Sequence, residues 1–320
     1  MLIGLIDVDN HKKLDKCFPN LPLMKLSAYH KQKGDQVEWY QSEKHYDVVY
    51  LSKVFSFTPD FDEPIDKDTI VIMGGTGYAI ELENGKETFH TEFHFNLPHE
   101  VEHIFPDYSL YGITNTAYGF MSRGCPRGCD FCHVEAKEGR KSFKVADLNE
   151  FWNGQKYIEL FDPNTLACKE WKDILQQLID SGACVNFNQG LDIRLMTKEK
   201  IDMLKQIKIK HVHFAYDRYQ DKRIIEKKLK AFKEETGWIR DKVSVYVLCN
   251  FDTTIEQDLD RIMFLKSLNF NPYVMRYDKE NIPRGSTINK IARWVNNKRF
   301  FWKYETFEDY CEAYDQGLTW

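Results

Sequence analysis

The chain has 320 residues, 42% of them hydrophobic and 29% charged, which is enough to bury a full core without stabilising disulfides. Its net charge of -5 provides no general electrostatic basis for binding nucleic acid. No apolar run approaches the roughly 20 residues that cross a bilayer, and the apolar opening precedes its charges, unlike a secretory signal, so we expect a cytoplasmic protein without a membrane partner.

The first 84 residues are predicted to form a small Rossmann-like α/β unit. Apolar runs at 2–8, 46–54 and 69–75 indicate strands, and apolar residues three and four apart over 21–35 indicate a helix. This pattern predicts a parallel unit with three strands. Residues 85–115 are rich in His, Pro, Phe and acidic residues without a clean period, and we expect them to form a linker.

Strand and helix patterns alternate over residues 116–280, which we expect to form the core. The predicted strands are 116–122, 156–162, 184–189, 211–217, 243–252 and 272–278. The predicted helices between them are 168–181, 197–207, 221–235 and 255–268. Such alternation predicts a parallel sheet that binds ligands at the carboxyl ends of its strands, but the period alone does not decide between an open sheet and a partial barrel.

Residues 281–320 mix aromatic with basic side chains. They predict a helical extension that packs over the core through anchors such as Trp294, Phe300 and Phe301. The same composition also suits stacking on a nucleic-acid strand.

Eight cysteines occur in the chain, and a reducing compartment favours metal binding or catalysis for any that cluster. Three of them lie within eight residues. The other five stand in apolar surroundings, where buried, inert thiols are the expected outcome. These five are Cys17, Cys168, Cys184, Cys249 and Cys311.

The clustered cysteines follow the first core strand in the sequence RGCPRGCDFC, which spans residues 123–132. The spacing lets one loop present Cys125, Cys129 and Cys132 to one corner of a cubane cluster, and the glycines and proline let the backbone turn tightly. Three thiolates for four irons leave one iron with an open position, which is typical of a catalytic rather than a structural site.

Three other interpretations of this loop stay open. His133 could complete a structural zinc site with the three cysteines. The run Cys129 to His133 satisfies the C-x-x-C-H pattern of covalent haem attachment, although the chain shows no export signal. The third alternative is a purely structural or electron-transfer cluster, which needs a fourth protein ligand.

The motif CPRGCDFC, with an aromatic residue before the last cysteine, resembles the signature of the radical S-adenosylmethionine superfamily. The resemblance covers residues 116–278, and the segments GLDIRL, VLCNFDTTIEQDLDRI and PYVMRYD are similar to a branch found in anaerobic bacteria and their phages. It implies a partial (β/α)6 barrel, a 4Fe-4S cluster and S-adenosylmethionine. It also implies a flavodoxin or ferredoxin type of electron donor, and reductive cleavage to a 5′-deoxyadenosyl radical that abstracts hydrogen from a substrate.

The resemblance also implies a set of cofactor-binding residues. Phe131 stands where the family holds the adenine, and Asn164 stands where a Gly-Gly-Glu motif binds the amino group, although Asp162-Pro163-Asn164 departs from that motif. The remaining candidates follow or end later strands, where polar groups reach ribose and carboxylate. They are Gln189, Asp192, Arg194, Asn250 and Met275.

The amino-terminal unit resembles a degenerate cobalamin-binding domain. Asp9-x-His11, Ser52-x-Val54 and Gly74-Gly75 match the order of that domain's signals, but Leu14 replaces a required glycine and three strands are too few to enclose a corrin. We therefore expect a structural or substrate-recognition role rather than cobalamin binding. The substrate is not identified by the sequence, although basic helices over 198–242 and the aromatic tail favour RNA or a nucleotide.

Overall fold

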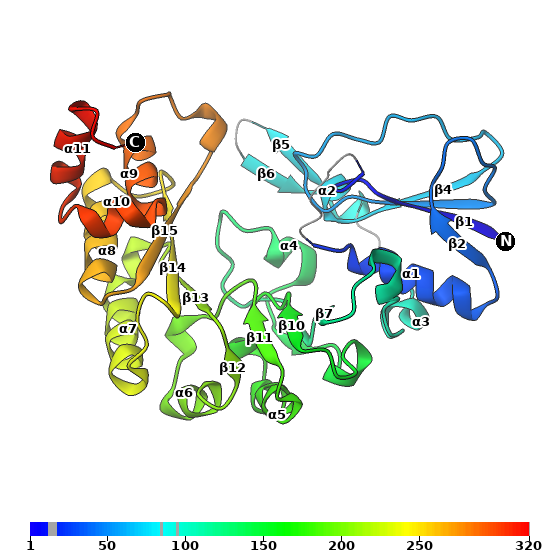
Figure 1. The fold of residues 1–320 in the computed structure, drawn as a ribbon, viewed down its shortest axis with the longest axis horizontal. Helices are drawn as coiled ribbons and strands as arrows, with labels where there is room; N and C mark the ends of the chain where they lie inside the picture. The colour runs from blue at the N-terminus through cyan, green and yellow to red at the C-terminus, as the bar shows by residue number, and fades with distance from the viewer. Residues whose placement is uncertain (12–17, 84–85, 94–95, 320) are drawn as a thin grey trace. The chain divides into compact units, whose positions relative to one another are not determined.

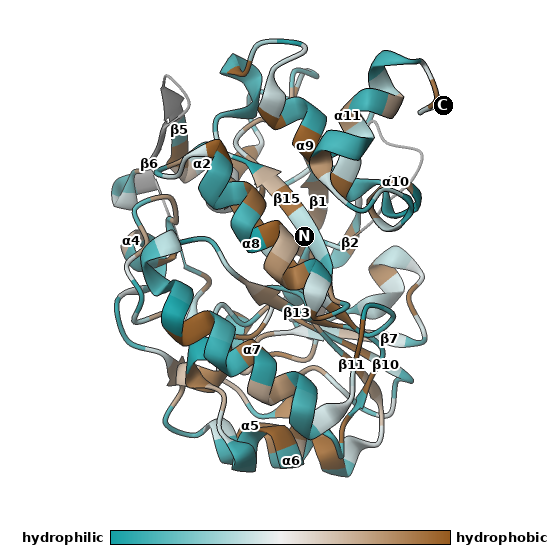
Figure 2. Cartoon of the chain, turned by 90° about the vertical axis from the view of Figure 1, so that its left-hand side faces the viewer, coloured by the Kyte–Doolittle hydropathy of each residue, from teal (hydrophilic) through white to brown (hydrophobic). Residues whose placement is uncertain are grey.

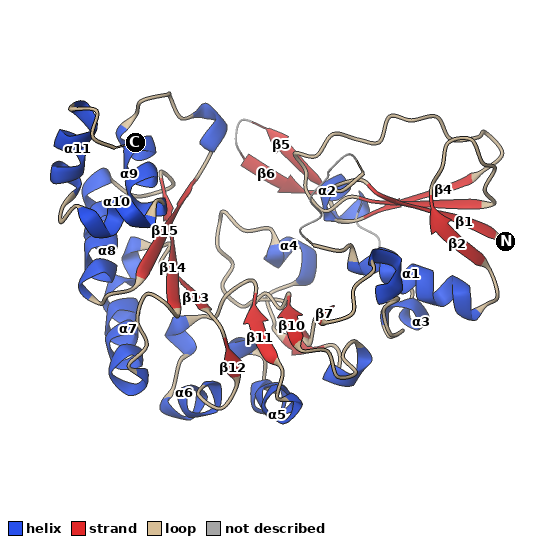
Figure 3. Ribbon diagram, in the orientation of Figure 1, coloured by secondary structure: helices blue, strands red, loops and turns tan. Residues whose placement is uncertain are grey.

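The computed structural model describes residues 1–11, 18–83, 86–93 and 96–319, so predictions that fall on Leu14, Cys17, Asn84 and Gly85 lie outside the described residues. The chain divides into two compact units, Met1–Glu159 and Leu160–Trp320. Both combine helices with parallel strands, which confirms the predicted α/β class (Figures 1 and 3). The predicted domain boundaries at 84, 115 and 280 stay a prediction.

The first unit opens with a four-stranded parallel sheet in the order β2-β1-β3-β4. The strands are β1 (Leu2–Asp7), β2 (Gln36–Trp39), β3 (Val48–Ser52) and β4 (Ile70–Gly74). The prediction of three strands was therefore too low. It missed β2, a short edge strand that alternates polar Gln36 and Glu38 with apolar residues and has no fully buried side chain.

Helix α1 (Leu21–Gln32) packs on this sheet. It begins where the Asn20 side chain accepts a hydrogen bond from the backbone of Leu23, and Pro22 occupies its first turn, where no amide donor is needed. Leu23 and Leu26 are buried against Ile3 and other sheet residues. The helix ends three residues before the predicted position, because Gly34 adopts a left-handed backbone conformation with φ of 83°.

The segment predicted as a linker contains regular structure. After α2 (Thr76–Ala79), strands β5 (Ile80–Glu83) and β6 (Lys86–Phe89) form an antiparallel hairpin, and α3 (His99–Glu102) follows. Two 3-10 turns, η1 (Thr91–Phe93) and η2 (Tyr108–Tyr111), complete it. The alternating sequence of 80–89 was the available signal for the hairpin.

The end of the first unit holds the cysteine loop. Strand β7 (Thr116–Gly119) leads to the two-residue strand β8 (Ser122–Arg123), which pairs antiparallel with β9 (Phe143–Lys144). Helix α4 (Val134–Glu138) lies between them, and η3 (Leu148–Glu150) precedes β10 (Tyr157–Leu160). The division between the units falls inside β10.

The second unit follows the predicted alternation closely. Its strands are β11 (Cys184–Phe187), β12 (Lys208–Ile209), β13 (Val212–Ala215), β14 (Val243–Cys249) and β15 (Asn271–Arg276). Between them lie α5 (Trp171–Ser181), α6 (Lys198–Leu204), α7 (Lys222–Thr236) and α8 (Ile255–Ser267). Strand β11 pairs in parallel with β12, and β13, β14 and β15 form a second parallel sheet. Short 3-10 turns occupy connections between these elements, namely η4 (Thr165–Ala167), η5 (Ile193–Leu195), η6 (Tyr219–Asp221) and η7 (Lys279–Asn281).

One face of the β13-β14-β15 sheet is buried under helices. Val243, Val245 and Val247 are fully buried, as are Ile225 on α7 and Ile262 on α8. Figure 2 shows that α7 keeps a mostly hydrophilic outer surface, as expected for a helix with one core-facing side. The opposite face of the sheet carries larger polar and aromatic side chains that are partly exposed.

The carboxyl-terminal residues form α9 (Thr287–Asn296), α10 (Lys298–Lys303) and α11 (Phe307–Asp315). Trp294, Phe301 and Tyr310 are fully buried, and the rings of Trp294 and Phe301 lie 5.1 Å apart. Asn296 exchanges hydrogen bonds with the backbone of Val274 on β15. These aromatic residues therefore act as core anchors of the extension. In the described part of the chain, no helix is long and apolar enough to span a membrane.

Candidate functional site

The cysteine motif forms a glycine-turned loop between β8 and α4. Gly124 and Gly128 both have positive φ, 79° and 56°. A side chain on Gly124 would meet the carbonyl oxygen of Lys141, which lies 2.1 Å from the position of a Cβ. Glycine is therefore required at the residue before the first cysteine, because only glycine combines that conformation with so close a backbone contact.

The three motif cysteines are thiols rather than disulfides. Cys125 and Cys129 are half-buried and Cys132 is exposed. A tight turn joins the last two, since the backbone amide of Cys132 donates to the carbonyl of Cys129 at 2.9 Å. Phe131 lies half-buried inside this turn. Cys132 is thus the most accessible of the three, whereas Cys125 and Cys129 are partly shielded from solvent.

The cysteine side chains are of the right chemical type to bind a metal cluster, but they are not already arranged around a metal position. Among the described residues, no three His, Cys, Asp or Glu side chains are gathered as a metal site. Thiolates are the soft donors that iron-sulfur clusters take, and the donor set therefore fits. The loop must close around the metal as it binds, which is common because ligand sites are rarely complete without their metal. His133, the candidate fourth zinc ligand, has its ring stacked on Phe89, with the ring centroids 6.4 Å apart.

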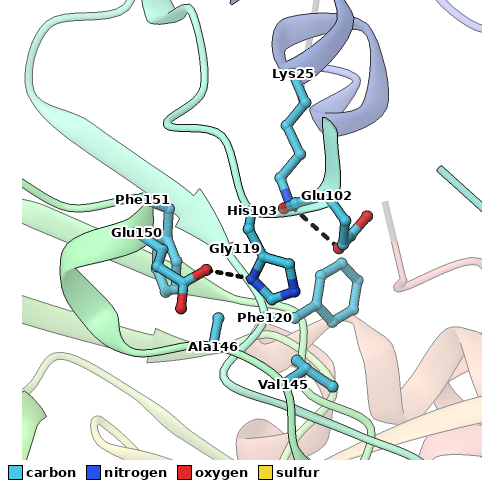
Figure 4. A pocket seen from close by; sticks show the side chains of 9 residues that line it. All are labelled: Lys25, Glu102, His103, Gly119, Phe120, Val145, Ala146, Glu150 and Phe151. Atoms are coloured by element: carbon cyan, nitrogen blue, oxygen red, sulfur yellow. Dashed lines mark hydrogen bonds and ion pairs between the residues drawn. The ribbon is translucent and has the colours of Figure 1, made fainter. Parts of the chain in front are cut away.

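A small hollow lies elsewhere in the first unit (Figure 4). Its volume is about 10 Å³, room for about one water molecule, whereas pockets for drug-sized ligands hold roughly 300 Å³ or more. The hollow is lined by Lys25, Glu102, His103, Gly119, Phe120, Val145, Ala146, Glu150 and Phe151. It is too small to be a nucleotide or cofactor site.

In the second unit, the structure brings three of the predicted cofactor residues together. The Asn164 amide lies 3.5 Å from Asp192, and Asp192 accepts a hydrogen bond from Arg194 Nε at 2.8 Å. Arg194 also donates to Asp221 at 2.6 Å. Burial alone would lower the pKa of Arg194, but the hydrogen bonds and charges of Asp192 and Asp221 outweigh it and raise that pKa. The guanidinium is therefore held in place as a cation between two carboxylates.

The other predicted residues lie at or after the carboxyl ends of strands, Asn250 and Met275 on the neighbouring strands β14 and β15 and Gln189 after β11 of another sheet. Asn250 follows β14 with a left-handed backbone, φ of 67°, and donates to the carbonyl of Tyr277 at 3.1 Å. Met275 on β15 is 47% exposed and lies beside Leu248 of β14. Gln189 is exposed after β11. A left-handed asparagine is an unusual conformation that functional sites often contain.

A buried charge cluster at the carboxyl end of β13 was not predicted from the sequence. Arg261 is fully buried and donates to the carbonyls of Tyr216, Asp217 and Leu248 at 2.6–2.9 Å. Asp217 accepts a hydrogen bond from the Leu248 amide at 3.1 Å, and burial raises its pKa to about 6. The only sequence signal was the pattern of charges in α8, which equally suits a solvated helix.

A histidine on the open face of the β13-β14-β15 sheet was also missed. The ring of His213 stacks on Tyr246 with centroids 5.3 Å apart, and Tyr246 meets Tyr273 edge to face at 5.8 Å. Burial, with a smaller contribution from His211, lowers the pKa of His213 to about 4. At neutral pH this histidine is therefore uncharged.

The cysteine loop belongs to the first unit and the other candidate residues belong to the second, apart from Phe131 in the loop itself. A scan against models of known protein families finds no match to the chain, and a search of curated proteins finds none either.

Proposed function

We propose that this chain is a radical S-adenosylmethionine enzyme. In this proposal Cys125, Cys129 and Cys132 hold a 4Fe-4S cluster on a partial (β/α)6 barrel. The proposal rests chiefly on one observation: three free thiols stand in a single glycine-turned loop that follows strand β8 of an α/β fold. When bound, the cluster would supply the electron that cleaves S-adenosylmethionine reductively.

The chain's own residues would bind and orient the cofactor. Arg194, held as a cation by Asp192 and Asp221, is the group we assign to the cofactor's carboxylate. Asn164 supports Asp192 on its other side. Gln189, Asn250 and Met275 stand at or after the carboxyl ends of β11, β14 and β15, where parallel sheets bind ligands, and Phe131 stands inside the cysteine turn.

We further propose a cytoplasmic enzyme that takes its electron from a flavodoxin or ferredoxin type of donor. Its substrate is RNA or a nucleotide in this proposal, a choice that the basic helices over 198–242 support. Trp294 and Phe301 are buried, so they do not support this choice. Its support comes from the exposed basic residues of α7, such as Lys227 and Lys230. Binding of RNA that does not weaken with added salt would count against it.

The direct test is metal analysis and turnover under anaerobic conditions. Wild-type protein reconstituted with iron and sulfide should carry a cluster, and dithionite should then release 5′-deoxyadenosine from S-adenosylmethionine. Cys125→Ala, Cys129→Ala and Cys132→Ala should each abolish release. Cys184→Ala and Cys311→Ala are matched controls, because both thiols are also half-buried but stand outside the loop, and both should retain activity.

Two outcomes would overturn the proposal. One is anaerobically purified protein that contains one zinc and neither iron nor labile sulfide, which would identify a non-catalytic zinc protein. The other is a cluster whose electron paramagnetic resonance spectrum is unchanged by S-adenosylmethionine, because a cluster ligated entirely by protein has no open iron.

A further inference from the structure

We propose that Glu138 is a positioning residue that closes the base of the cysteine loop and connects it to helices α1 and α3. This inference takes the identity of the metal from the proposed function. The geometry on which it rests, however, lies entirely within the first unit and concerns the loop without its metal.

Glu138 joins the two ends of the loop through one carboxylate. It is the last residue of α4, and only 8% of its side chain is exposed. Its Oε2 accepts a hydrogen bond from the backbone amide of Gly124 at 2.9 Å, and its Oε1 accepts one from Arg123 Nη1 at 3.1 Å. Because Gly124 precedes Cys125 directly, this contact fixes the backbone at the first cysteine. Charge-assisted hydrogen bonds of this kind are roughly twice as strong as neutral ones.

Arg123 extends the contact away from the loop. Its guanidinium covers the ring of Phe120 at 3.7 Å, and its second terminal nitrogen lies 3.6 Å from Glu102 on α3. Glu102 in turn pairs with Lys25 on α1 at 3.1 Å, and Lys25 also donates to the Glu102 carbonyl (Figure 4). The result is an alternating ion chain, Lys25-Glu102-Arg123-Glu138, that ends on the cysteine loop.

The two ends of the ion chain are more buried than its middle, because the side chains of Arg123 and Glu102 are 24% and 33% exposed. The Lys25 side chain is 11% exposed, and burial lowers its pKa while Glu102 partly opposes that shift. Lys137, whose pKa burial also lowers, lies 3.8 Å from Glu138. Buried charges whose partners are all present are rigid, whereas removing one partner leaves an uncompensated charge.

A second backbone contact supports the same closure. The amide of Cys125 donates to the carbonyl of Gly139 at 3.3 Å, next to Glu138. The loop between Gly124 and Glu138 is thus closed at its base by one backbone bond and one carboxylate. In this proposal the ion chain lets α1 and α3 brace the cysteine loop.

The first test measures the loop in metal-free protein, as the rate at which iodoacetamide alkylates each cysteine, followed by mass spectrometry of the peptides. Loss of a charge-assisted hydrogen bond worth about 1.5–3 kcal/mol should speed alkylation of Cys125 by about 10- to 100-fold in Glu138→Ala. Glu138→Gln keeps one acceptor but turns an amide donor toward the other partner, so it should speed alkylation by less than Glu138→Ala does. Glu100→Gln, which removes an exposed carboxylate from α3, is the control and should change nothing.

The second test measures the reduction midpoint potential of the reconstituted cluster. Glu138→Gln removes a negative charge beside the loop, which opposes the added electron, so the potential should become more positive than in wild type or Glu100→Gln. A merely structural residue would leave this potential unchanged.

The outcomes separate the two proposals. If no variant binds a cluster but Glu138→Ala still exposes Cys125, the proposed enzyme activity fails and the positioning role stands. If Glu138→Ala does not fold, the reduction midpoint potential of the Glu138→Gln cluster tests the positioning role instead. A folded Glu138→Ala with unchanged Cys125 alkylation, or a Glu138→Gln cluster with unchanged potential, overturns the positioning role.

Discussion

Strand β4 of the first unit and strand β14 of the second are both rich in apolar residues but lie in opposite environments. Four consecutive apolar residues of β4 are between 44% and 61% exposed, namely Ile70, Val71, Ile72 and Met73. In β14, Val243, Val245 and Val247 are fully buried. The difference comes from coverage, because β4 is an edge strand, whereas β14 is central and has α8 packed against it. Apolar strand sequence therefore does not by itself mean a buried strand.

The largest expected effect concerns the residue that ties α8 to the second sheet. Arg261→Met should cost about 3–5 kcal/mol of unfolding free energy, because it leaves Asp258 buried without its ion-pair partner at 2.5 Å. Urea unfolding followed by circular dichroism measures this. Lys227→Met on the exposed side of α7 is the control and should stay within about 0.5 kcal/mol of wild type. A loss below about 1 kcal/mol for Arg261→Met would show that the coverage of this sheet does not depend on the ion pair.

The next prediction compares the same substitution, valine to alanine, in the buried strand β14 and in the exposed strand β4. Val245→Ala should destabilise the protein by about 2 kcal/mol, because it opens a cavity in a fully packed core. Val71→Ala should cost less than about 0.5 kcal/mol, since its side chain is already 44% exposed. The same unfolding measurement applies to both variants. Equal losses would mean that β4 is covered in solution by something outside this chain.

A smaller effect is expected in the pH dependence of stability, which His213 on the partly exposed face of the β13-β14-β15 sheet should influence. The pKa of His213 is about 4 in the folded protein and 6.5 in the unfolded chain, so between these values the unfolded chain takes up the proton first. Acidification from pH 6.5 to 4 should therefore destabilise wild type relative to His213→Gln, by about 1 kcal/mol after allowance for partial exposure.

Asp217 titrates in the opposite sense over part of this range, because burial raises its pKa to about 6 and the folded state then takes up the proton first. The measurement is therefore the difference between wild type and His213→Gln in urea midpoint at pH 7 and pH 4.5, in which Asp217 cancels. A difference that is the same at both pH values would contradict a neutral, buried His213.

The smallest expected effect on stability concerns the exposed strand. Val71→Lys should change the unfolding free energy by less than about 0.5 kcal/mol, but a lysine on an edge strand discourages pairing with another chain. Light scattering at increasing concentration should show less self-association than wild type. Lys67→Ala, just before the strand, removes a charge that opposes association and should shift it the other way. No change in either variant would show that the exposed edge does not pair.

Much of the second unit was predictable from its sequence. The four helices and the strands at 184–189, 211–217, 243–252 and 272–278 appear within a few residues of their predicted positions, because long amphipathic periods and apolar runs are local signals. The need for a tight turn at the cysteine motif was also predictable from its glycines. Strand β2 and the hairpin at 80–89 were not, since short or partly polar strands acquire their stability from neighbours.

What the sequence by itself determined is the order of the main helices and strands of the second unit, the α/β class and the spacing of three cysteines in one loop. Those features depend on residues close together in the chain. The tertiary structure alone decided that β4 is exposed, that Arg261 is buried against three carbonyls, and that Glu138 joins Gly124 to an ion chain reaching Lys25. Burial and ion pairing depend on which distant segments of the chain come into contact. Local patterns of hydrophobicity or charge do not predict those contacts.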